Sequence, residues 1–144
     1  MVGGQAIDLQ AANGSTRLDG SALRAMHGRK TGALIRAAAG AGAIMGGGSA
    51  DVVGAIESFA NHVGLAFQIV DDILDVEGAG DQLGKTTGKD AAAGKPTYPA
   101  LYGLDESRRL AAEAIARALQ SLTDAGLGYA RLFELADWVA ARRN

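Results

Sequence analysis

The chain has 144 residues, of which 48% are apolar, and a formal net charge of −2. This length and composition fit one globular domain, or a large piece of one. The slight negative charge and the lack of a long basic run argue against a nucleic-acid partner. The chain has no cysteine, which excludes disulfides, thiolate catalysis and cysteine zinc sites and is compatible with a cytoplasmic location.

No targeting segment or membrane span is expected. The first residues lack the basic and apolar regions of a signal peptide. The most apolar stretch, residues 31–48, is interrupted by Arg36 and contains six glycines. Few aromatic residues and abundant alanine and glycine favour closely packed helices over β-sheets.

The first predicted helix begins near Asp19 or Ser21, which are both good N-cap residues, and ends at the glycine run 46–48. Lys30 lies on the apolar stripe of this helix, seven residues after Leu23 and four before Leu34. A lysine there must extend to water, pair with a carboxylate or bind an anion. The neighbouring His27 is interpreted as a residue of the helix surface.

The second predicted helix starts after Ser49 and runs to about Val76. Its apolar residues alternate at spacings of three and four, and its length is about 40 Å. A polar stripe follows the other side, consisting of Glu57, Asn61, Gly64, Gln68, Asp71 and Asp75. Ordinary amphipathicity also explains this stripe, and Gly64 and Gln68 would then be surface residues without a special role.

Two further helices are predicted, one capped by Asp105 and running toward Gly126, and one over residues 129–143. The second and third helices are joined by residues 77–99, a loop rich in glycine, aspartate and lysine. Such a long loop in a compact domain is often functional, although loop lysines are commonly just solvated. No strand pattern of comparable length is present, so the sequence predicts an all-α fold.

Three carboxylates crowd the end of the second helix, in the run Asp71-Asp72-Ile73-Leu74-Asp75. Two carboxylates one helical turn apart repel by about 3 kcal/mol at an effective dielectric constant of about 20. The partial negative charge of a helix C-terminus adds to this cost. A divalent cation would reverse both penalties, and oxygen ligands without histidine or cysteine indicate Mg²⁺. A solvated acidic helix end is the alternative.

Taken together, the residues resemble the trans-prenyl (polyprenyl) diphosphate synthase family, in particular bacterial farnesyl and geranyl diphosphate synthases. Five strings carry the resemblance in family order over nearly the whole chain: residues 4–9 (GQAIDL), 27–34 (HGRKTGAL), 64–75 (GLAFQIVDDILD), 83–85 (LGK) and 94–101 (GKPTYPAL). The resemblance implies the C-terminal half of the isoprenoid-synthase helical bundle, with residues 1–144 forming part of one polyprenyl synthase domain.

The resemblance also implies a role for each matching residue. Asp71, Asp72 and Asp75 look like the second aspartate-rich motif, which binds Mg²⁺. The diphosphate, carbocation and supporting roles fall to another nine residues: Lys30 and Lys85 (allylic diphosphate), Thr31 and Gln68 (carbocation), Phe67 (isopentenyl diphosphate pocket), Gln5 and Asp8 (polar support of Lys30), and Asp90 and Lys95 (support of the metal–diphosphate site).

The implied reaction condenses isopentenyl diphosphate with an allylic diphosphate. However, the sequence lacks the first aspartate-rich motif of the family and the basic residues that hold isopentenyl diphosphate. We therefore expect a fragment, a misassigned start or a split enzyme, which is inactive alone and forms a homodimer or associates with a missing N-terminal half. A non-catalytic helical subunit is the alternative. A terpene cyclase is a weaker one, because cyclases carry a mixed Asn/Ser/Glu motif where this chain has aspartates.

Overall fold

The structure is a computed structural model, and it describes residues 2–13, 18–81 and 96–142. Its helices are α1 (Val2–Ala12), α2 (Gly20–His27), the π-helical turn η1 (Gly28–Gly32), α3 (Ala33–Met45), α4 (Ala50–Asp81), α6 (Tyr98–Tyr102), α7 (Leu104–Asp124) and α8 (Ala130–Ala140). No strand occurs in these described ranges, so the predicted all-α fold is confirmed. Within the same ranges, no helix combines the length and the apolar character that crossing a bilayer requires.

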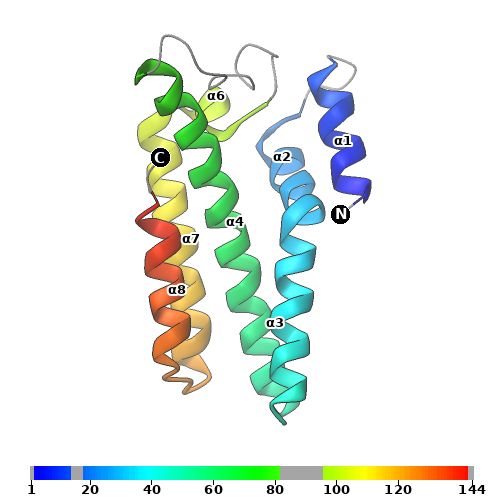
Figure 1. Ribbon diagram of the computed structural model, residues 1–144, viewed down its shortest axis with the longest axis vertical. Coiled ribbons are helices and arrows are strands. Elements are labelled where there is room, and N and C mark those ends of the chain that lie inside the picture. The colour runs from blue at the N-terminus through cyan, green and yellow to red at the C-terminus, as the bar shows by residue number, and fades with distance from the viewer. Residues whose placement is uncertain (1, 14–17, 82–95, 143–144) are drawn as a thin grey trace.

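The long helix α4 is the central element of the bundle (Figure 1). It packs most extensively against α7 and then against α3, while α8 lies against both α4 and α7. The short helix α1 lies at the edge of the bundle, beside α2 and η1. The predicted site residues in the described ranges therefore lie on α1, η1 and α4, and η1 contacts both of the other helices.

The first predicted helix forms as α2, η1 and α3 in succession. Asp19 caps it as expected, because its Oδ1 accepts a hydrogen bond of 2.8 Å from the backbone N–H of Ala22. The π-helical turn was not predicted, and it changes the rotational register of the helix. Leu23 is fully buried, whereas Leu34 is 55% exposed. The predicted stripe through Leu23, Lys30 and Leu34 is therefore wrong.

Other helix boundaries differ from the prediction as well. Helix α4 continues to Asp81, and α1 and α6 were not predicted. Asp105 does not cap α7, because the helix starts at Leu104 after Gly103, whose φ of 82° favours glycine. Asp105 instead lies in the first turn and pairs with Arg108 at 2.8 Å.

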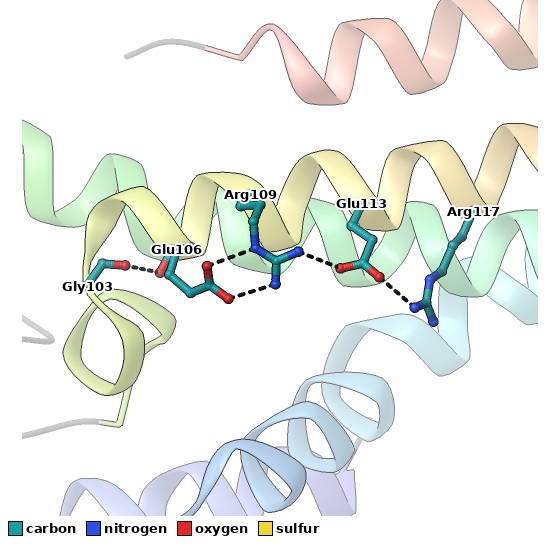
Figure 2. A network of polar contacts seen from close by, with 6 residues as sticks. Gly103, Glu106, Arg109, Glu113 and Arg117 are labelled. Atoms are coloured by element: carbon teal, nitrogen blue, oxygen red, sulfur yellow. Dashed lines mark hydrogen bonds and ion pairs between the residues drawn. The ribbon is translucent and has the colours of Figure 1, made fainter.

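Helix α7 has a buried face and a charged, exposed face. The charged face carries a chain of ion pairs from Glu106 through Arg109 and Glu113 to Arg117 (Figure 2), and part of this chain borders the cavity between α2, α4, α6 and α7. Hydrogen bonds from Arg109 lower the pKa of Glu106, and those from Arg117 lower the pKa of Glu113. These groups are solvent-exposed, so their ion pairs contribute little to the stability of the fold. Their charges favour contact of this face with water.

Two apolar clusters hold the helices together. The first joins α4, α7 and α8 and includes Phe59, Val63, Leu122 and Val139. The second joins α1, α2, α4, α6 and α7 around buried residues such as Leu23, Met26, Ile69, Ile73 and Tyr98. The second cluster contains sequence neighbours of the predicted site residues, such as Ile7 on α1 and Ile69 and Ile73 on α4.

Candidate functional site

The three aspartates of the acidic motif lie in the last turns of α4 but have different surroundings. Asp71 is exposed, and its Oδ1 lies 3.5 Å from Nη1 of Arg142. Asp72 is nearly buried, and its Oδ2 accepts a hydrogen bond of 2.9 Å from the backbone N–H of Tyr98. Asp75 has a buried Oδ2 without a hydrogen-bond partner among the described residues. The three carboxylates thus differ in exposure and in their hydrogen-bond partners among the described residues.

These carboxylates do not form a complete protein cage for a metal ion. In the described part of the chain, no three His, Cys, Asp or Glu side chains converge on one point. Mg²⁺ is commonly held by one or two carboxylates, with water and phosphate oxygens completing its shell. The unpartnered Oδ2 of Asp75 and the exposed Asp71 fit this arrangement, because both offer hard oxygen atoms.

Lys30 pairs with a carboxylate, which is one of the three outcomes that the sequence allowed. Its Nζ donates a hydrogen bond of 2.6 Å to Oδ2 of Asp8. Asp8 is buried, while the Lys30 side chain is 32% exposed. The pair joins α1 to η1, which also carries the half-buried Thr31. Gln5, on α1, is exposed.

Close approach of α1 to η1 depends on Gly4. A Cβ atom at Gly4 would collide with the backbone nitrogen of Lys30, whereas one at Gly3 would meet open space. Only glycine therefore allows the two helices to come close enough for Asp8 to contact Lys30.

A Gly4→Ala substitution should therefore destabilise the protein by about 1–3 kcal/mol, the usual cost of overpacking. It should also increase hydrogen exchange in α1. Gly3→Ala is the matched control and should be neutral or stabilising by up to about 1 kcal/mol, because alanine favours the helix. Urea unfolding followed by circular dichroism measures both variants, and equal stability of the two would contradict this packing.

Gln68 and Gly64 are buried, so they are not surface residues of an ordinary amphipathic helix. An added Cβ on Gly64 would touch Gly32 and Ile35 at 3.4 Å, which means that η1 and α3 pack directly on α4 there. The interpretation of His27 as a surface residue is wrong. His27 is 6% exposed, and its Nδ1 lies 3.0 Å from Oε1 of Gln68. Residues of α4 and α6 bury the His27 ring. These residues are distant from His27 in sequence, so no local pattern predicted its burial.

Phe67 lies next to Arg142, which was not among the candidate residues predicted from the sequence. The guanidinium of Arg142 lies over the Phe67 ring, 4.4 Å from its centroid, and also approaches Asp71. Arg142 therefore links the C-terminal end of the described chain to the acidic end of α4. The basic residues at positions 142 and 143 are a visible signal, but the sequence does not place them near the acidic motif.

The remaining predicted site residues, Lys85, Asp90 and Lys95, lie outside the described residues. A cavity of about 380 Å³ occurs between α2, α4, α6 and α7, and its walls include Arg24, His62, Tyr98 and Arg117. None of the predicted site residues lines it. Burial, aided by the nearby Arg24 and Arg117, lowers the pKa of His62.

Comparisons with known proteins agree with the resemblance seen in the motifs. The family model described as polyprenyl synthetase matches residues 1–126. Farnesyl diphosphate synthase of Escherichia coli is 44% identical over 148 residues, an alignment that covers 100% of this chain and 49% of that protein. Dimethylallyltranstransferase of Fischerella ambigua is 41% identical over 144 residues, which cover 100% of this chain and 41% of that protein.

The fold is similar to that of solved prenyltransferases. A geranyltransferase from Helicobacter pylori, solved with magnesium and isoprenyl diphosphate, superposes with a TM-score of 0.75 at 30% identity. The superposition covers 96% of this chain and 45% of that one. The chain thus spans about half, or less, of the length of these relatives. Because the family model covers most of the sequence, the chain belongs to the polyprenyl synthetase family.

Proposed function

We propose that this chain carries the second aspartate-rich, Mg²⁺–diphosphate half-site of a prenyltransferase that condenses isopentenyl diphosphate with an allylic diphosphate. The observation that carries the proposal is the grouping of Asp71, Asp72 and Asp75 at one end of α4, with Gln68 one turn away. The names of the relatives, among them a farnesyl diphosphate synthase and a dimethylallyltranstransferase, support prenyl transfer over cyclisation.

The residues of this chain would divide the work between the diphosphate and the reacting carbons. Bound Mg²⁺ would supply positive charge that stabilises the diphosphate leaving group. Lys30, already near a carboxylate on α1, would contact the same diphosphate as it departs with the bonding electron pair.

The oxygens of Thr31 and Gln68 would stabilise the allylic cation. Phe67 would form a wall of the isopentenyl diphosphate pocket. Attack by the isopentenyl double bond and loss of a proton would then give an allylic diphosphate that is five carbons longer. Gln5 would support Lys30 through α1, and Lys85, Asp90 and Lys95 would contribute to the diphosphate site.

We further propose that this half-site is inactive alone. The sequence contains one DDxxD motif, and the reaction needs a second group of metal ligands to hold the diphosphate from its other side. The missing half would come from an N-terminal segment or from an associated subunit. The proposal includes a cytoplasmic location, with which the absence of cysteine is compatible.

A chimera tests the function directly. In this chimera, our chain replaces the matching region of the Escherichia coli farnesyl diphosphate synthase. We expect the chimera to elongate dimethylallyl diphosphate in a Mg²⁺-dependent reaction, and the chain alone to show no turnover. A folded chimera without activity would contradict the proposed function, and turnover by the chain alone would contradict the half-site.

A non-catalytic, associating subunit remains the second candidate. Several large apolar side chains are exposed, among them Trp138 at 60% and Ile44 at 64%. Such exposure favours association with a second copy or with another chain. Mg²⁺-dependent affinity for a diphosphate separates the two candidates, because a subunit that only associates should have none.

A further inference from the structure

The cavity between α2, α4, α6 and α7 is not used by the proposed half-site. Its volume is about 380 Å³, and none of the predicted site residues in the described ranges lines it. Pockets for small molecules usually have volumes of about 300–1,000 Å³. The aliphatic part of its wall consists of Leu65, Ile69, Leu110 and Ala114. Because closely packed helices rarely leave a space of this size, the cavity is a candidate for a second ligand site.

Two tyrosines of α6 give the cavity an aromatic wall. Tyr98 is buried, whereas Tyr102 is 44% exposed. The centroids of the two rings lie 5.9 Å apart, and the ring planes are tilted by 33°. Rings in such an arrangement offer both a face and an edge, and a further aromatic ring packs favourably on either. The wall therefore suits an occupant with a flat, apolar body.

Arg24 differs from the other charged residues of the wall, because it has no charged partner among the described residues. Glu106 and Glu113 both form ion pairs with Arg109 (Figure 2). Glu113 also accepts a hydrogen bond of 2.6 Å from Arg117. The carboxylates of the wall are thus already paired with cations, and the charge left for an occupant is positive.

His62 adds a polar but uncharged group to the same wall. Burial lowers the pKa of His62, and the charges of Arg24 and Arg117 lower it further, so the imidazole is neutral at physiological pH. The charge of Arg24 therefore acts on the wall of the cavity and not only on solvent. Arg24 also borders a second hollow of about 50 Å³, which means that empty space adjoins this residue in two places.

We propose that this cavity binds a small aromatic carboxylate, whose ring packs on Tyr98 and Tyr102 and whose carboxylate pairs with Arg24. A guanidinium can donate two parallel hydrogen bonds to one carboxylate, and such charge-assisted bonds are stronger than neutral ones. A cationic occupant would meet Arg24 and would find the glutamates of the wall already paired. The site is separate from the acidic motif, and the proposal does not depend on prenyl transfer.

NMR titration of the nitrogen-15-labelled chain with indole-3-acetate as the probe tests the site. We expect saturable binding with a Kd of about 1 mM or lower, the affinity of a ligand of about a dozen non-hydrogen atoms at ordinary efficiency. Indole-3-acetamide has the same size and no charge, so it should bind about 10-fold or more weakly. No saturation by about 10 mM indole-3-acetate, or equal affinity for the two compounds, would overturn the proposal.

The same titration locates the bound probe. The backbone signals that move should belong to residues of the wall, such as Leu65, Leu110 and Ala114. Signals of α8, which contributes no residue to the wall, should stay in place. Shifts confined to α8 or to the N-terminal helix α1 would contradict binding in this cavity.

Arg24→Gln tests the charged contact, and Arg36→Gln is its matched control. Both arginines are exposed, so both variants should fold, but Arg36 lies on α3 and does not line the cavity. Arg24→Gln should weaken the binding of indole-3-acetate by about 10-fold or more and leave that of indole-3-acetamide within about twofold. Arg36→Gln should change neither affinity by more than about twofold. Equal affinity of the two variants for indole-3-acetate would overturn the assignment of Arg24.

Discussion

Replacing Asp75 with asparagine in the chimera should reduce kcat by about 100-fold or more, because loss of one preorganised electrostatic group at a developing charge typically has such an effect. Asp75 has a buried Oδ2 without a hydrogen-bond partner among the described residues, so this oxygen is available as a ligand of a cation. Steady-state kinetics over a range of Mg²⁺ concentrations measures the effect, and the variant should also need more Mg²⁺ for half-maximal rate.

The matched control for this experiment is Asp51→Asn, which removes a carboxylate from the first turn of the same helix. Asp51 is exposed and lies at the opposite end of α4 from the acidic motif. Its replacement should leave the rate within about twofold of the parent, because surface changes far from a site have small effects. An Asp75→Asn variant as active as Asp51→Asn would show that the acidic end of α4 is only a solvated face.

Replacing Leu122 with alanine should lower the free energy of unfolding by about 2–5 kcal/mol. Leu122 is fully buried on α7, in the apolar cluster that joins α4, α7 and α8. The substitution leaves a cavity between three helices that the closely packed bundle can fill only in part. Urea unfolding monitored by circular dichroism measures the loss as a lower midpoint with an unchanged slope.

Leu135→Ala provides the same chemical change at an exposed site. Leu135 lies on α8 and is 44% exposed, so its truncation should change the free energy of unfolding by less than about 1 kcal/mol. A Leu122→Ala variant no less stable than Leu135→Ala would contradict the packing of α7 on α4.

Local patterns predicted α4, α7, α8 and the helical run from α2 to α3, whereas α1 and α6 were not predicted. The apolar spacing predicted α4, and the N-cap at Asp19 was correct. The π-helical turn was not predictable in this way, because no periodic pattern marks it. The neighbouring helix α1 has two glycines in its first turns and no strong apolar face, so local patterns did not predict it. Only the tertiary structure shows that Gly4 allows close contact between α1 and η1.

The placement of the candidate site residues was easiest to predict where a motif lies on one helix. Asp71, Asp72 and Asp75 needed only the spacing of α4, and the structure places them there. Contacts between elements were not visible in the local sequence pattern. His27 meets Gln68 across 41 residues, which was not predicted, and the contact of Lys30 with Asp8 across 22 residues was implied only by the family resemblance. The burial of such residues depends on partners that periodicity cannot identify.

Titration of the chain with inorganic pyrophosphate, in the presence and absence of Mg²⁺, tests the Mg²⁺–diphosphate half-site most directly. Isothermal calorimetry should show saturable binding that requires Mg²⁺ and that the Asp75→Asn variant loses. Binding of equal strength without Mg²⁺, or no binding under either condition, would contradict the account.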